Sequence, residues 1–213
     1  MSRASKEKMR RQLARSFREL RATGQPIPTR ESTAWHEAAH AVVAEYFDFP
    51  VEYVTCEPQT HKGETYLGYC MGSGNVQVGL AGAWYGLMHA YAGFVCEWRR
   101  GTMKRGFADP RDFDGARETL DQLQARSKGK DIFEVVCGCT EEFLEWAWDV
   151  VGDVAAQLLA NGRMEGVALR EMVRMRLGYI PRDKQHEMWQ GVVTQPGSEA
   201  STREPWWRKE SQP

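Results

Sequence analysis

The chain has 213 residues and a mass of 24.3 kDa, which is enough for one domain with a hydrophobic core. Hydrophobic residues make up 42% and charged residues 27%, as in ordinary globular proteins, and the net charge of −1 argues against a nucleic-acid-binding protein. The five cysteines are odd in number and scattered, so we expect no disulfide framework and a reducing compartment, the cytoplasm.

Positive charge is concentrated at the N-terminus. Residues 1–23 contain eight Lys or Arg and two Glu, a net +6, so the remainder must carry about −7 (−1 minus +6). The spacing of the apolar residues predicts an amphipathic helix over residues 2–22. We expect this basic helix to dock on its own domain or on a neighbouring subunit, with a membrane surface or nucleic acid as weaker alternatives. No signal peptide is expected, because no apolar stretch follows the charged N-terminus.

Residues 24–180 are expected to form one domain that is mostly α-helical with a small β element. A helix is predicted over residues 32–47, followed by two strands over 51–58 and 65–72 that pair with each other. Longer helical patterns then cover four ranges: 76–100, 111–127, 131–161 and 165–177.

Two segments are interpreted from their composition. Residues 78–96 carry no formal charge and are almost long enough to cross a membrane, but their glycines, His89 and tyrosines favour a buried core helix, so we expect no membrane span. Residues 181–213 are polar and rich in turn residues, which predicts a mobile C-terminal tail. Trp206 and Trp207 are unusual in such a tail.

The candidate site is the His-Glu-x-x-His motif of His36, Glu37 and His40. Residues four apart share one face of a helix, so both imidazoles can point at one zinc ion. Glu37 lies about 100° round the helix, where it can reach a zinc-activated water as a general base. Such a motif arises by chance roughly once in a hundred chains of this composition. The alanine-rich helix around it predicts burial, which would be costly for two histidines and a glutamate without a metal.

A third ligand has to come from elsewhere in the chain. Asp112 and Ala116 share one face of a predicted helix, whereas Asp114 points nearly the opposite way. A small residue beside the aspartate leaves room for a metal, so Asp112 is favoured. The other histidines are interpreted as structural or surface residues: His61, His89 and His186. Cys137 and Cys139 could also suggest a metal site, but no second cysteine pair at zinc-ribbon spacing accompanies them.

Four ordered segments resemble the peptidase domain of the FtsH family of AAA zinc metalloproteases. "ESTAWHEAAHAVV" (31–43) resembles the zinc helix of that family, and "YAGFVCEWRRG" (91–101) resembles its Gly-Gly-x-x-Ala-Glu helix end, keeping Gly93 and Glu97. "RDFDGA" (111–116) resembles its Asn-Asp-Leu-x-x-Ala segment, with Asp112 in the place of the ligand. "LLANGRMEGVALREMV" (158–173) is similar to its closing helix-turn-helix.

The resemblance implies a zincin-like metallopeptidase domain, mostly helical with a small β element. His36, His40 and Asp112 would bind Zn²⁺, and Glu37 would be the general base. The implied activity is hydrolysis of peptide bonds in unfolded or flexible polypeptides. The strand at residues 51–58 would border the active site, where an extended peptide could add to a free strand edge.

The chain also departs from the family pattern. Ala39 replaces a glycine, Arg111 replaces an asparagine, and no ATPase module or membrane anchor is recognisable in the sequence. We therefore expect either a homo-oligomeric ring like that of the family or a separate ATPase partner, with the basic helix of residues 1–23 as an assembly element. One alternative is a zinc-containing adaptor or regulator of another protease or ATPase, without turnover. Another is a helical interaction protein in which the motif is accidental.

Overall fold

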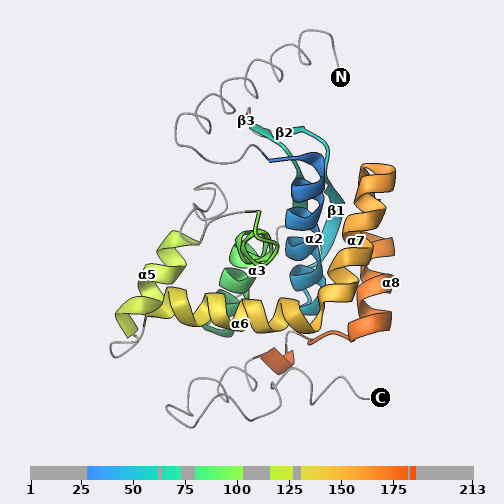
Figure 1. Ribbon diagram of the computed structural model, residues 1–213. Helices are drawn as coiled ribbons and strands as arrows, with labels where there is room; N and C mark the ends of the chain where they lie inside the picture. Colours follow the sequence, from blue (N-terminus) through green and yellow to red (C-terminus); the bar gives the residue numbers. More distant parts are fainter. Residues whose placement is uncertain are drawn as a thin grey trace, which may run out of the picture.

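The computed structural model describes residues 28–61, 64–72, 80–102, 116–126, 131–181 and 183–185. These residues form a mostly helical fold with small antiparallel sheets, which confirms the predicted fold class at this level (Figure 1). The elements in chain order are α2 (Arg30–Tyr46), β1 (Val51–Thr55), β2 (Gln59–His61), β3 (Glu64–Tyr66), β4 (Tyr69–Gly72), α3 (Leu80–Arg99), α5 (Arg117–Arg126), α6 (Ile132–Trp146), α7 (Trp148–Asn161), β5 (Arg163–Glu165) and α8 (Gly166–Leu177).

Helix α2, which carries the His-Glu-x-x-His motif, is the centre of the fold and contacts α3, α7, α8, β1 and β4 (Figure 1). It begins with a capping box, in which the Thr29 side chain accepts a hydrogen bond from the Ser32 backbone N–H and the Ser32 side chain accepts one from the Thr29 backbone N–H. Its small residues let neighbouring elements approach closely on several sides, and seven of them are buried: Ala34, Ala38, Ala39, Ala41, Val42, Val43 and Ala44.

The three-stranded sheet has the order β4-β1-β5, with both pairs antiparallel, and β2 and β3 form a separate hairpin. The predicted pairing is therefore confirmed for Val51–Thr55 with Tyr69–Gly72, whereas Glu64–Tyr66 pairs with Gln59–His61 instead. Val54 on β1 is paired with Cys70 on β4 and with Met164 on β5, and these three residues share the inner face of the sheet. The chain returns from α7 into β5 through Gly162, which has a φ of 76°.

The prediction of one long helix over residues 131–161 is wrong, because the chain forms two helices that meet at Ala147. Ala147 donates its N–H to the Phe143 carbonyl and accepts hydrogen bonds from Val150 and Val151. Helix α6 packs against α3, whereas α7 packs against α2. The change of direction thus buries each helix against a different partner, and no glycine or proline marks it in the sequence.

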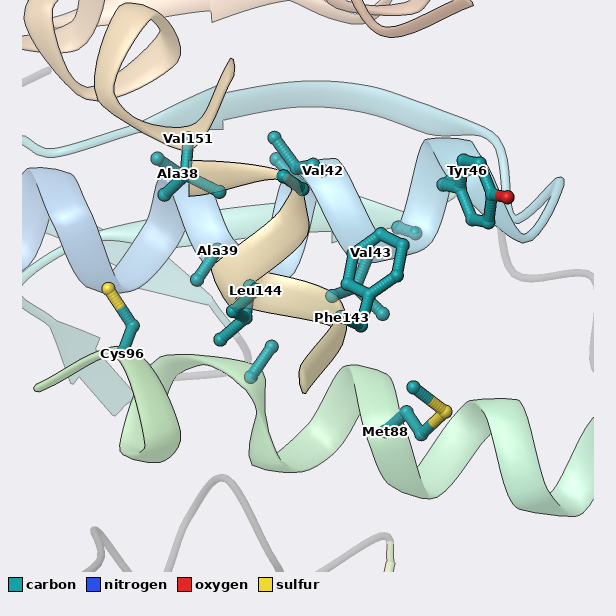
Figure 2. Close-up of a cluster of buried hydrophobic side chains, with 14 of the residues drawn as sticks. Ala38, Ala39, Val42, Val43, Tyr46, Met88, Cys96, Phe143, Leu144 and Val151 are labelled. Atoms are coloured by element: carbon teal, nitrogen blue, oxygen red, sulfur yellow. The ribbon is translucent and has the colours of Figure 1, made fainter. Parts of the chain in front are cut away.

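The core joins α2, α3, α6 and α7, as Figure 2 shows for part of the buried cluster. Helix α3 lies in this core, with Tyr85, Met88 and Val95 fully buried, as predicted for the apolar segment. No helix in the described ranges is long and apolar enough to cross a membrane.

The first residues of the predicted C-terminal tail pack against the domain. The Gln185 side chain is 2% exposed, and it donates hydrogen bonds to the carbonyls of Phe47 and Ile180. Residues 186–213, with Trp206 and Trp207, and the predicted basic helix of residues 2–22 lie outside the described residues.

Glu45 connects the end of α2 to two other elements. Its side chain is fully buried. Its Oε1 accepts a hydrogen bond from the Val51 backbone N–H at 2.8 Å, and its Oε2 lies 3.0 Å from Nε of Arg170 on α8. The carboxylate is therefore paired on both oxygens, as a buried charge requires.

We predict that Glu45→Ala lowers the free energy of unfolding by about 2–3 kcal/mol, because the Val51 N–H and the Arg170 guanidinium both lose an acceptor. Urea denaturation followed by circular dichroism measures the loss. The matched control is Glu171→Gln, at an exposed position of the same helix as Arg170, with an expected change within about 0.5 kcal/mol. Equal effects of the two substitutions would show that the buried pair does not stabilise the fold.

Candidate metal centre

The two histidines of the motif converge on one point. His36 and His40 follow each other by one turn of α2, and their Nε2 atoms lie 3.0 Å apart. Two nitrogen ligands at about 2.0 Å from a tetrahedral zinc ion are about 3.3 Å apart. The separation of the two Nε2 atoms therefore fits a pair of ligands to one ion.

Both Nδ1 atoms are held by helix α3. Nδ1 of His40 lies 2.7 Å from the His89 carbonyl oxygen, and Nδ1 of His36 lies 3.1 Å from Oε1 of Glu97. A carbonyl oxygen only accepts hydrogen bonds, so His40 carries its proton on Nδ1, and the Glu97 carboxylate fixes the same tautomer in neutral His36. A carboxylate or carbonyl on the second ring nitrogen is the usual support of a metal-binding histidine.

These tautomers leave a lone pair on each Nε2. Two lone pairs at 3.0 Å repel each other unless a cation lies between them. That cation is either a metal ion or a proton on one of the rings. The donor set therefore fits zinc, which prefers neutral imidazole nitrogens, and the arrangement is more specific than two histidines that merely share a helix face.

Glu37 faces a different neighbour, the turn between β3 and β4. A Cβ atom at Gly68 would lie 2.6 Å from Cγ and 2.8 Å from Oε1 of Glu37, so only glycine fits there. The Glu37 side chain is almost buried. Burial, and next the negative charge of Glu37, raise the pKa of the Cys70 thiol on β4 well above its ordinary value. The carboxylate therefore lies beside the start of β4.

Gly93 is the point at which α3 approaches the His36 ring. A Cβ atom at this position would overlap the His36 imidazole at Nε2, Cε1 and Cδ2. Glu97, four residues later on the same face of α3, binds the other nitrogen of that ring. The two residues singled out in the segment 91–101 thus both contact His36.

The third expected ligand, Asp112, lies outside the described residues, which resume at Ala116. Ala116 is buried, and α5, which follows it, contacts α3 and α6. Within the described ranges, no group of three or more His, Cys, Asp or Glu side chains could hold a metal. The described part of the site is therefore the pair His36 and His40, with Glu37 beside it.

One expectation needs correction. The strand at residues 51–58 does not present a free edge, because β1 pairs with β4 on one side and with β5 on the other. His89, interpreted from the sequence as a structural or surface residue, has a structural role: its backbone carbonyl orients His40, and its ring centroid lies 5.2 Å from that of His40. Its helical spacing from Gly93 was the only signal for this position. No pattern in the sequence indicated Gly68, because its role depends on how the turn before β4 packs against α2.

Two thiols, Cys96 on α3 and Cys139 on α6, are held in the protonated form. Burial raises the pKa of Cys96 to about 12. Burial also raises the pKa of Cys139 to about 12. A cysteine binds zinc as a thiolate, so these side chains are poor competitors for the metal.

We predict that Gly93→Ala displaces the His36 ring and weakens zinc binding by at least about tenfold, comparable with the loss of a supporting contact. The control is Gly86→Ala on the same helix, where an added Cβ has no neighbour within 4 Å. That change should keep zinc binding and raise stability by about 0.5–1 kcal/mol, as expected of glycine in a helix interior. Zinc affinity by competition with a chelator distinguishes the two; equal affinities would contradict the close approach.

We predict slow alkylation of Cys96 and Cys139 by iodoacetamide in the folded protein. With pKa values of about 12, the thiolate fraction at pH 8 is about a thousandfold lower than for a free cysteine. These raised pKa values favour the folded state below about pH 8.5, and this contribution is lost as the pH rises towards 12. Peptide mapping by mass spectrometry measures the labelling, with the denatured chain as the control. Rapid labelling of either folded thiol would contradict its burial.

Comparison with known proteins adds no assignment. No protein-family model matches the chain, and neither does any curated protein sequence. The resemblance to the FtsH family therefore stays a prediction from its ordered motifs.

Proposed function

We propose that this protein is a zinc-dependent endopeptidase with a zincin-like domain of the FtsH type, acting on unfolded or flexible polypeptides. The observation that carries the proposal is the convergence of His36 and His40. Their Nε2 atoms lie 3.0 Å apart, while Glu97 and the His89 carbonyl hold both Nδ1 atoms. His36, His40 and Asp112 would bind the metal, with Asp112 assigned by the motif of residues 111–116.

Zinc held at this point would polarise the scissile carbonyl and lower the pKa of a water molecule to near 7. Glu37 would take the proton of the attacking water and deliver it to the leaving amine nitrogen. Its place on α2 supports this role, because Glu37 follows His36 directly while its side chain meets the turn at Gly68. Glu97 and the His89 carbonyl would keep the two rings in the tautomer that leaves Nε2 available.

The edge of β4 is the best candidate for holding the peptide. In the described part of the chain, no strand pairs with the side of β4 that faces away from β1. Gly68 directly precedes β4 and touches Glu37, so a peptide added to this edge would pass close to the carboxylate. Backbone pairing of this kind is largely independent of side-chain identity, which suits a protease for unfolded chains.

Zinc content and turnover test the proposal together. We expect about one zinc per chain by elemental analysis of the wild type, a clear loss in Asp112→Ala, and retention in the neighbouring control Asp114→Ala. Glu37→Gln should keep the metal and lose about a hundredfold or more in the rate of cleaving an unfolded polypeptide, the usual contribution of a general base.

The other outcomes are equally informative. A wild type without zinc, even after reconstitution, would remove the metallopeptidase. Zinc retained in full by Asp112→Ala would mean that another residue is the third ligand. A zinc-loaded wild type without turnover, whose binding to a partner survives Glu37→Gln, would instead identify an adaptor or regulator.

A further inference from the structure

An open cavity lies on the side of α3 that faces α6 and α7. Its volume is about 490 Å³, and it is lined by Trp98 and Arg99 at the end of α3, Glu141 on α6 and Trp148 on α7. Trp98 follows Glu97 in the sequence, and adjacent helical residues point about 100° apart. The cavity is therefore separate from the candidate metal centre, although both use the last turns of α3.

The cavity is lined by two indole rings, one guanidinium and one carboxylate, and two further carboxylates, Glu142 and Glu145, lie near Glu141 on α6. Arg99 is the one cation among its lining residues. Its guanidinium already lies 5.0 Å from the Trp148 ring centroid and 3.8 Å from the Glu145 carboxylate. Among the described residues, no cation forms an ion pair with Glu141 or with Glu142 beside it. Burial, and then the charges of Glu141 and Glu145, raise the pKa of Glu142. An added positive charge would relieve this repulsion.

A tryptophan ring beside a carboxylate is the chemistry that recognises an ammonium or guanidinium group. The matching charge is present in the chain itself, because residues 1–23 contain eight Lys or Arg and two Glu. The described part of the chain begins at residue 28, a few residues after this segment. Glu31, in the first turn of α2, pairs with Arg100, which neighbours the lining residue Arg99. Trp35, one turn later, has its ring centroid 5.0 Å from that of Trp148.

We propose that this cavity is the docking site of the basic segment of residues 1–23, which places a lysine or arginine side chain against Trp98 and Glu141. Charge complementarity and the position of Glu31 and Trp35 beside the cavity, a few residues after the segment, select it as the occupant. The occupied cavity would fix the segment against the α3, α6 and α7 side of the domain. This proposal does not depend on zinc or on turnover, so it stands or falls separately from the proposed peptidase.

Limited trypsin digestion of the full chain tests the docking, because trypsin cuts after the lysines and arginines of the segment. We expect Glu141→Gln to increase the rate of cleavage within residues 1–23 by about two- to fivefold, the effect of one partly exposed ion pair with an aromatic partner. Trp98→Ala should have at least as large an effect. The control Glu171→Gln, at an exposed position of α8, should leave the rate unchanged.

Circular dichroism and thermal unfolding show whether Trp98→Ala remains folded, and Glu141→Gln keeps the test valid if it does not. Wild-type cleavage as fast as that of a synthetic peptide of residues 1–23 would overturn the proposal, as would rates unaffected by both cavity substitutions. Protection independent of protein concentration would support docking within one chain. Protection that increases with concentration would support docking of the same segment on a second copy.

Discussion

The candidate site depends on the close packing of α3 against α2. Gly93 leaves no space between the α3 backbone and the His36 ring, and the same face of α3 supplies the acceptors for both histidine Nδ1 atoms. The relative position of the two helices therefore sets the tautomers, the ring orientations and the convergence of the Nε2 atoms. A shift of either helix would change the tautomers, the ring orientations and the convergence together, because closely packed helices transmit strain to one another.

Different sides of α2 have different partners. Helix α3 holds the imidazoles, while the turn before β4 meets the Glu37 side chain at Gly68. The end of α2 is fixed by the buried Glu45, which reaches β1 and α8. The histidines and the glutamate are thus held by different elements.

The first turns of α2 are held by aromatic and cationic side chains. The guanidinium of Arg100 lies 4.7 Å from the Trp35 ring centroid, and Trp35 contacts Trp148, whose other neighbour is Arg99. Gly152 on α7 leaves room for the Trp35 ring, since an added Cβ would lie 3.3 Å from it. This cluster connects α2, which carries His36 and His40, to the cavity between α3, α6 and α7. The candidate site and the cavity therefore share one structural framework.

The sequence by itself determined the features that depend on local pattern. Hydrophobic periodicity predicted α2, the paired strands and most helices, and the four-residue spacing placed His36 and His40 on one face. Tertiary structure alone decided what depends on contacts between distant residues. It divided residues 131–161 into two helices at Ala147, because α6 and α7 pack against different partners. It placed β1 between two other strands. It also brought the His89 carbonyl to His40 and Gly68 to Glu37, because such contacts depend on how whole elements pack, which a local pattern does not encode.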